Sequence, residues 1–341
     1  MQIATYIIRR LILLIPVLLG VSIFVFALTR VAGDPISVYV TPRMGIEEIA
    51  QLRENLGLDE SVPVQYFLWL KEMIINLNLG YSKFAELPVT ECLVKYFPAT
   101  LELTLWSMII SIIIGIWLGT ISAVKKDTMV DHTTRVTSLI AVSIPVFWLG
   151  LLLLDLFYYI LGWAPAPTGR HDEISYPISE INSYTQIMLI DTALNWRWDM
   201  FVDALAHLIL PAITLSFATV ALIVRMMRSS MLEVLGSEFV RTARMKGASE
   251  RTVIRRHARR NALIPTTTVI GLSFGGLLTG AVLTESIFSW PGIGRWSAGA
   301  LLANDQAAIV GFTLFSAIIY VLANLIVDVL YAYLDPRVRL G

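Results

Sequence analysis

The chain contains six apolar segments that are each long enough to cross a lipid bilayer. A helical span needs about 20 mostly apolar residues. Hydrophobic residues make up 56% of the 341 residues and charged residues only 15%, which is more apolar surface than a soluble domain of this size can bury. We therefore predict an all-α polytopic membrane protein with six transmembrane helices. The segments are residues 11–28, 100–124, 136–161, 204–224, 263–284 and 308–333.

The distribution of positive charge predicts the orientation of these spans. Cytoplasmic loops of membrane proteins carry an excess of Lys and Arg. With both termini inside, 17 of the 26 Lys and Arg residues fall on the inner side. The first segment follows Arg9 and Arg10 like a secretion signal, but its apolar run is long and no small-residue cleavage site follows, so we interpret it as a retained anchor. The prediction is N-in and C-in.

The spans divide the chain into three regions. Residues 1–30 form an N-terminal anchor helix. Residues 31–98 form an extracytoplasmic region with two short helices, the first ending at Gly57 and the second beginning near Pro63. Residues 99–341 form a five-helix core that contains an acidic outer loop, residues 162–203, and a cytoplasmic loop, residues 225–262.

The cytoplasmic loop is the most unusual polar segment of the chain. It carries ten Lys or Arg residues. Ser237 and Ser249 are in N-cap positions, and Gly247 is a candidate left-handed stop, so the loop is predicted to hold two short helices separated by a glycine. A short, ordered, basic helical pair between two spans is typical of a surface that a partner binds.

Several enzyme classes are not indicated. The sequence contains no HExxH, GxSxG or phosphate-binding GxxxxGK[ST] motif. It has one cysteine, and its four histidines lie far apart, so no metal site is predicted. We expect no catalytic residues, no bound cofactor and no ATP hydrolysis by this chain alone.

Segments throughout the chain resemble one family. The cytoplasmic segment EFVRTARMKGASERTVIRRHARRNALIP, at residues 238–265, closely resembles the coupling loop of ABC importer permeases of the dipeptide, oligopeptide and nickel class. The segments PATLELTL (98–105), SIPVFWLGLLL (143–153), ESIFSWPGIGRW (285–296) and YLDPRVRLG (333–341) agree with the same family. Residues 163–203 depart from it by being longer and more acidic.

The resemblance implies a set of partners in the cytoplasmic membrane of a prokaryote. These are a second, paralogous permease, two ABC ATPase subunits that bind ATP and Mg²⁺, and an extracytoplasmic substrate-binding protein. The centre of the loop would dock on an ATPase. Phe239, Val240 and Ala243 form a small apolar patch, with basic residues around it. The predicted coupling residues are Glu238, Phe239, Val240, Arg241, Thr242, Ala243, Arg244, Lys246 and Gly247.

Two other interpretations of the basic loop were weighed. Arginines at span ends commonly reach anionic lipid headgroups, and this interpretation is favoured for Arg225, Arg228, Arg259 and Arg260. A basic helical pair is also typical of DNA binding, but tethering at both ends by spans leaves little room for a duplex. We expect no nucleic-acid partner.

Polar and small residues within spans are candidates for the translocation path. Ionisable groups inside a membrane are costly and are functional candidates by default. Asp155 lies deepest and is predicted to face the path or the partner permease. Glu102, near the outer end of its span where it can reach water, is a second candidate. Gly271 and Gly275 belong to a small-residue pattern that permits close approach to a partner or around a pore. Pro145 and Pro211 are candidate kinks.

The segment around Trp290 is a candidate outer gate. Pro291, Gly292 and Gly294 enforce a turn, and Trp290 and Trp296 are predicted to anchor it at the membrane interface. The residues alone indicate an anchored turn, and the resemblance implies a gate or re-entrant element.

The function that these features predict is that of the membrane-spanning permease subunit of an ABC importer for peptides. Oligosaccharides, nickel or other small solutes are alternative cargoes, since importers of this type leave selectivity to the binding protein. A secondary transporter driven by an ion gradient through Asp155 is the competing class, but such a transporter would not need the coupling loop.

Overall fold

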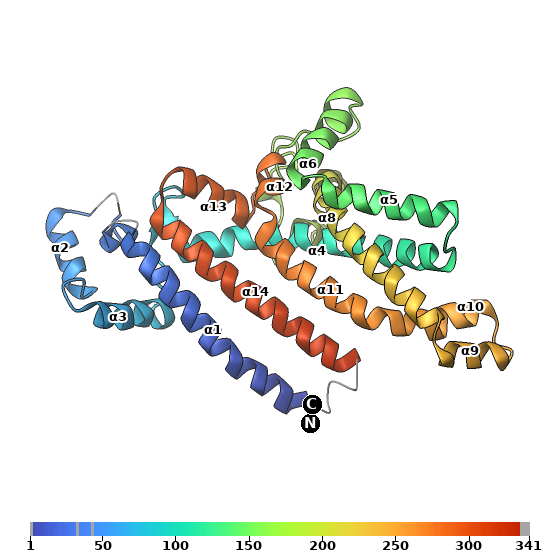
Figure 1. Ribbon diagram of the computed structural model, residues 1–341. Helices are drawn as coiled ribbons and strands as arrows, with labels where there is room; N and C mark the ends of the chain where they lie inside the picture. The colour runs from blue at the N-terminus through green and yellow to red at the C-terminus, as the bar shows by residue number, and fades with distance from the viewer. Residues whose placement is uncertain (1–2, 32–33, 42–43, 335–341) are drawn as a thin grey trace.

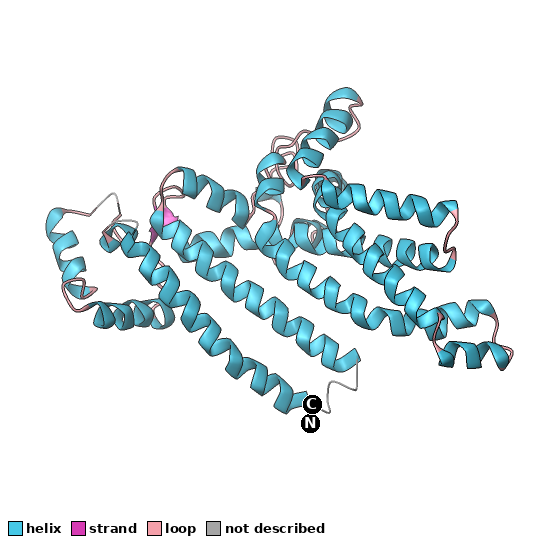
Figure 2. Cartoon of the chain, in the orientation of Figure 1, coloured by secondary structure: helices cyan, strands magenta, loops and turns pink. Residues whose placement is uncertain are grey.

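The protein is almost entirely helical. The computed structural model describes residues 3–31, 34–41 and 44–334 (Figure 2). Within these described residues, five helices are long and apolar enough to cross a membrane. Four of these helices contain the first, second, fourth and sixth predicted spans. A helix through residues 250–278 covers most of the fifth. The bounds are α1 (Ile3–Val31), α4 (Val89–Val124), α8 (Trp198–Leu235), α11 (Arg259–Gly280) and α14 (Gln306–Leu334).

The third predicted span is broken. Helix α5 (Met129–Ser143) and helix α6 (Val146–Leu154), which continues in the π-helical segment η2 (Asp155–Ile160), meet at an angle of 101°. Ile144, just before Pro145, has an extended backbone with φ −80° and ψ 125°. A residue before proline is disfavoured in the α region, so the helix ends there. Pro145 therefore turns the chain, whereas Pro211 lies inside the continuous helix α8. Five helices and one bent pair account for the six apolar segments.

Helix α8 is the centre of the bundle. It packs against α4, α5, α6, α11 and the short helix α7 (Met188–Leu194). In α8, 67% of the most apolar 18-residue window is buried, compared with 17% in α1. Helix α1 contacts α14 and displays Ile12, Ile15 and Phe24 on the surface of the chain, as expected for side chains that face lipid. The helical bundle is thus built around the fourth span.

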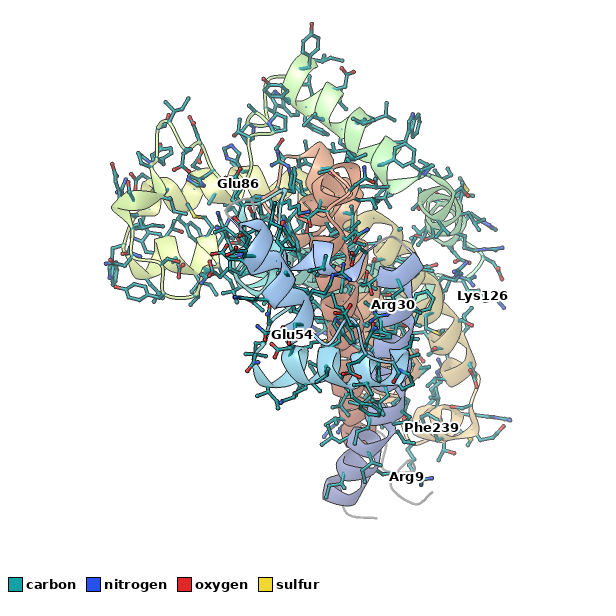
Figure 3. All side chains as sticks on the ribbon, turned by 90° about the vertical axis from the view of Figure 1, so that its left-hand side faces the viewer. Arg9, Arg30, Glu54, Glu86, Lys126 and Phe239 are labelled. Atoms are coloured by element: carbon teal, nitrogen blue, oxygen red, sulfur yellow. The ribbon has the colours of Figure 1, made fainter. Side chains whose placement is uncertain are left out.

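The bundle has two chemically different ends. The start of α1 and the end of α14 lie at the bottom of the view, and the α4–α5 turn lies at its right edge (Figure 1). The short helices α9 (Glu238–Met245) and α10 (Glu250–Thr252) lie at the lower right, between these two places. We call this the basic end. After a quarter turn of the view, Arg9 and Phe239 lie at the bottom of the molecule and Glu86 lies well above them (Figure 3). The start of α1 and the end of α14 thus lie toward the end that carries the basic loop.

The opposite end carries the predicted helical region that follows the first span. It contains η1 (Pro35–Val38), α2 (Ile46–Asn55) and α3 (Val62–Ile75) (Figure 1). Gly57 has φ +61° and ends the first of these two α-helices, as predicted. A two-stranded hairpin, β1 (Tyr81–Ser82) and β2 (Leu87–Pro88), then leads directly into α4. The second span therefore begins its helix at Val89, well before residue 100.

The same end also holds the segments that join the later spans. The outer loop folds into η3 (Ile178–Glu180) and α7, and the chain after α11 forms α12 (Val282–Ile287) and α13 (Ile293–Leu302). A cluster of buried apolar residues from α4, α7 and α8, with Trp290, holds these parts together.

Candidate functional site

The loop predicted to couple the chain to an ATPase is a short, closed helix. Ser237 precedes α9 with φ −77° and ψ 152°, the extended backbone of an N-cap residue. Its hydroxyl does not accept a hydrogen bond from α9 but donates to the carbonyl of Val234 at 2.6 Å. Ser237 is therefore an N-cap in its backbone only, and its side chain fastens the loop to the end of α8.

The far end of α9 is closed by a glycine in the left-handed region. Gly247 has φ +81°. Its N–H donates to the carbonyl of Arg244 at 2.9 Å, and the N–H of Ala248 donates to the carbonyl of Ala243 at 3.1 Å. These two bonds form a Schellman motif, which satisfies carbonyls that a helix end leaves open. The predicted stop at Gly247 is confirmed.

The apolar surface of α9 differs from the predicted patch. Val240 is fully buried against its own chain, and Ala243 is half-buried. The expectation that Val240 belongs to an exposed patch is wrong, because one face of this short helix packs on the segment after α10. The exposed apolar side chains are those of Phe239, at 47%, and Met245, at 72%.

The charged residues of α9 have two different roles in the structure. Arg244 donates from Nε to Glu250 Oε1 at 2.7 Å, so it braces α9 against α10, and this hydrogen bond raises its pKa. Arg241 is highly exposed and lies 3.9 Å from Glu238, a separation at which a surface pair contributes little. Lys246 is also exposed. Arg241 and Lys246 thus remain accessible to a partner.

The second predicted helix of the loop is not separate. Helix α10 begins after Ser249 and continues through the π-helical segment η4 (Val253–Ala258) into α11. The segment where η4 runs into α11 packs in an apolar cluster that joins the second, fourth and fifth spans. The cluster consists of Ala123, Met227, Met231, Ala258 and Ala262. The loop is therefore an extension of the fifth span, fastened to two others.

Arg228 is held by a carboxylate. Its Nε and second terminal nitrogen donate to Asp131 Oδ1 and Oδ2 at 2.6 and 2.7 Å. Asp131 has a fully buried side chain and also accepts from the hydroxyl of Ser122 and the N–H of Asp127. The expectation that Arg228 reaches lipid headgroups is wrong, because a buried carboxylate nearby binds it more specifically. Sequence reasoning missed Asp131, although an acid among the basic residues of the α4–α5 turn was a usable signal.

At the opposite end, the turn around Trp290 is fastened into the bundle. Trp290 is 1% exposed, and its indole Nε1 donates to the carbonyl of Ala99 at 2.7 Å. Trp296 is also buried and stacks on Tyr96. The prediction that these two tryptophans are interfacial anchors is wrong, because the α4 helix extends far enough outward to cover them.

A buried carboxylate organises the same turn. Glu285 accepts from the hydroxyl of Thr100 at 2.6 Å and from the N–H of Arg295 at 2.9 Å. The N–H of Ile293 donates in turn to Thr100 Oγ1 at 2.9 Å. Glu285 therefore meets the first turn of α13, where an anion is stabilised by unpaired N–H groups. A Cβ at Gly292 would lie 2.3 Å from the Glu285 carboxyl, so only glycine fits there.

Glu102 is clamped by the outer loop. Arg170 approaches its Oε2 at 3.3 Å, and the N–H of Leu189 donates to its Oε1 at 2.9 Å. The side chain of Glu102 is 1% exposed, so the expectation that it reaches water is wrong. The acidic loop thus supplies the partners that make a buried acid acceptable.

The remaining predicted path residues lie apart from one another. Asp155 is exposed on the surface of this chain, at the start of η2. Gly275 faces α14, where an added Cβ would lie 3.4 Å from Tyr320. Gly271 is buried in α11. Their predicted roles in translocation stay predictions.

The contact between α4 and α8 uses a small-residue pattern that sequence reasoning overlooked. Added Cβ atoms at Gly115 and Gly119 of α4 would lie 2.5 Å from Ile223 and 2.7 Å from Met227 of α8. Small residues recur at every fourth position along this face of α4, and all are buried: Ser107, Ser111, Gly115, Gly119 and Ala123. This spacing lets two backbones approach closely.

These features describe a polytopic helical membrane protein with a structured basic loop at one end. Comparison with known families places it more narrowly. The family profile for the inner membrane component of binding-protein-dependent transport systems matches residues 111–340, and that for the N-terminal part of such components matches residues 3–104. The chain belongs to this family of ABC transporter permeases.

Curated relatives cover nearly the whole chain. The dipeptide transport system permease protein DppB of Alkalihalophilus pseudofirmus is 43% identical over 335 residues, which are 98% of this chain and 99% of the relative. The di/tripeptide transport system permease protein DppB of Pseudomonas aeruginosa is 44% identical over 337 residues, 98% of each chain. The oligopeptide transport system permease protein AppB of Bacillus subtilis is 37% identical over 338 residues, 98% of this chain and 99% of the relative.

Proposed function

We propose that this chain is one of two permease subunits of an ABC importer for peptides. A second, paralogous permease forms the path with it, two ATPase subunits bind ATP and Mg²⁺ on the cytoplasmic side, and an extracytoplasmic binding protein delivers the cargo. The basic end faces the cytoplasm. The observation that carries this proposal is the closed helix α9, which presents exposed apolar and basic side chains on a rigid support.

The docking face follows from the exposure of α9. Phe239 and Met245 enter an apolar groove on an ATPase, where burying each contributes about 1.5–3 kcal/mol. Arg241 and Lys246 lie at the rim and form charge-assisted hydrogen bonds with acidic groups of the partner. Glu238 and Thr242 share this exposed face.

The connections of α9 explain how motion passes into the membrane. The Schellman closure at Gly247 and the Arg244–Glu250 pair hold α9 against α10, which is continuous with α11. The cluster around Met227 links α11 to α4 and α8. Closure of the ATPases therefore moves these helices as rigid bodies, since packed elements transmit displacement instead of absorbing it.

The path is proposed to run beside the surfaces that this chain leaves uncovered. Asp155 faces the second permease or the path, and Gly271 and Gly275 allow α11 to approach α14 closely on one side of it. Glu102 supports the path wall through its clamp with Arg170. The turn from Trp290 to Gly294 acts as an outer gate that moves together with α13, because Glu285 ties the turn to that helix.

Peptide is the proposed cargo because the similar permeases belong to dipeptide, di/tripeptide and oligopeptide systems. Oligosaccharides or nickel are the alternatives. Uptake should be measured in vesicles that contain the assembled importer and its binding protein. We expect uptake of dipeptides that needs ATP and is blocked by excess unlabelled peptide. Uptake without ATP that collapses with the ion gradient would instead establish a secondary transporter.

The docking face is tested by co-purification. Met245→Glu places a charge on the proposed contact, and we expect the ATPases to be lost while the permease still inserts. Met129→Glu is the matched control, because Met129 is 78% exposed at the same end of the bundle but lies outside α9. Retention of the ATPases by Met245→Glu to the same extent as by Met129→Glu would exclude this face.

A further inference from the structure

A polar cavity opens at the basic end, between α5 and α8. It has a volume of about 300 Å³. Its walls combine guanidinium and hydroxyl groups, as a site for a phosphate group requires. The polar lining residues are Thr134, Arg135, Ser138, Arg225, Arg228 and Ser229.

The cavity is positively charged. Arg228 is neutralised by the buried carboxylate of Asp131, which also holds its guanidinium in place. Arg135 and Arg225 are exposed, and neither has a hydrogen-bond or ion-pair partner within the described part of the chain. The positive charges of Arg135 and Arg225 are thus uncompensated at the cavity, whereas Arg228 is held in place by Asp131.

An apolar groove continues from this cavity toward the middle of the bundle. The groove has a volume of about 350 Å³ and shares Ser138, Ala221 and Val224 with the polar cavity. Side chains from α4 and α8 form its apolar walls: Ile110, Ile114, Leu118, Ile213, Phe217 and Val220. The joined site is cationic at one end and apolar along the rest.

The length of the joined site fits one leaflet of a membrane. Arg225 and Ile213 lie twelve residues apart on α8, which corresponds to about 18 Å along a helix. The hydrocarbon core of a bilayer is about 30 Å thick, so one acyl chain extends through about 15 Å of it. A bound lipid with its headgroup at Arg225 would place its chain along the whole groove.

We propose that this site binds an anionic phospholipid of the cytoplasmic leaflet, with its phosphate between Arg135 and Arg225 and one acyl chain in the groove. The proposal rests on the orientation given above, with the basic end in the cytoplasm. A soluble anion would use the arginines but not the groove, and a zwitterionic lipid would bring an ammonium group that cancels the charge of its phosphate and is repelled by the two arginines. The bound lipid would tie α5 to α8 beside the Asp131–Arg228 pair.

The test measures lipid retained by the purified importer after reconstitution in vesicles of equal phosphatidylglycerol and phosphatidylethanolamine. We expect phosphatidylglycerol to be enriched on the wild-type complex. Each basic residue near anionic lipid is worth about 1 kcal/mol, or about fivefold. Arg135→Gln combined with Arg225→Gln should therefore lower the enrichment about 25-fold. Arg251→Gln with Arg255→Gln, two exposed arginines outside the cavity, should leave it unchanged.

A second pair of variants tests the apolar half. Val220→Trp fills the groove and should also lower the enrichment, whereas Ile109→Trp, on α4 but outside the groove, should not.

Equal enrichment in the arginine variants and their control would overturn the proposal. The proposal would also be overturned if inorganic phosphate displaced the lipid and Val220→Trp did not change the enrichment. That result would indicate a site for a soluble anion. Cross-linking of Ile114→Cys, in the wall of the groove, to the second permease would assign the groove to protein, because the native Cys92 is buried and does not compete. ATPase co-purification is a separate readout and is not affected by these outcomes.

Discussion

Arg228 donates two hydrogen bonds to the fully buried carboxylate of Asp131, at 2.6 and 2.7 Å, and so joins the fourth span to the first half of the broken third span. The pair lies at the basic end, one turn of α8 from Arg225. A bidentate arginine–carboxylate pair fixes both distance and orientation. It therefore holds α5 against α8 just where the basic loop begins.

Removal of the arginine should destabilise the protein strongly. Arg228→Gln leaves Asp131 buried without its cation, which typically costs about 3–5 kcal/mol. We expect a clear fall in the thermal unfolding temperature of the purified protein. Arg241→Gln is the control, because Arg241 is 74% exposed in a 3.9 Å pair, and such pairs contribute at most about 1 kcal/mol. Similar falls in the unfolding temperature of the two variants would show that the buried Asp131–Arg228 pair does not contribute strongly to stability.

The small-residue face of α4 should not tolerate a large side chain. Gly115→Leu places atoms where Ile223 of α8 already lies, so the helices must separate. Overpacking of this kind costs about 1–3 kcal/mol. We expect lower yield of folded protein and a lower unfolding temperature. Gly20→Leu is the matched control, since a Cβ at Gly20 of α1 meets nothing within 4 Å. A comparable loss in Gly20→Leu would point to a general effect of leucine.

The hydroxyl group of Thr100 should contribute more to the stability of the protein than the volume of its side chain does. Thr100→Val keeps the side-chain volume but leaves both the Glu285 carboxylate and the Ile293 N–H without this partner. An unsatisfied buried polar group costs about 1–3 kcal/mol. We expect a lower unfolding temperature and faster proteolysis at the α12–α13 turn. Thr133→Val, at an exposed position of α5, should change neither property. An unchanged turn in Thr100→Val would mean that Glu285 is satisfied by other groups.

Loss of Arg170 should release the outer loop. Arg170→Gln removes the cation that meets Glu102 and donates to the carbonyl of Gln186 at 2.8 Å. Chymotrypsin cleavage after Tyr176 and Tyr184 should then become faster, as followed by mass spectrometry of the fragments. Lys83→Gln, at an exposed position in the β hairpin, should keep the wild-type cleavage rate. Equal rates in both variants would show that the loop is held without the Glu102–Arg170 contact.

The sequence predicted those parts of the fold that depend on local rules. Apolar length located the spans, because a bilayer requires each span to satisfy its own backbone hydrogen bonds. Gly57 and Gly247 marked helix ends correctly, since both adopt a positive φ that other residues rarely reach. Pro145 was recognised as a possible kink. Its bend of 101° was not predicted, because the direction after a proline depends on what the second half of the helix packs against.

The errors concern partners that are distant in sequence. Val240, Trp290 and Glu102 were each assigned to an exposed or interfacial position, and each is buried. Nothing in the neighbouring residues showed that α4 would cover Trp290 or that the outer loop would bring Arg170 to Glu102. The four-residue repeat of small side chains in α4 was present in the sequence and was a missed local signal.

The sequence by itself therefore determined the membrane environment, the number of apolar segments, the glycine-closed helix of the basic loop and the family of the chain. These follow from hydrophobic length, helix-ending residues and motifs that act over a few residues. Only the tertiary structure decided which arginines are paired and which are available, because that depends on whether a carboxylate from another helix lies within reach. Arg228 and Arg225 are three residues apart on one helix, yet Asp131 binds the first and leaves the second facing an open cavity.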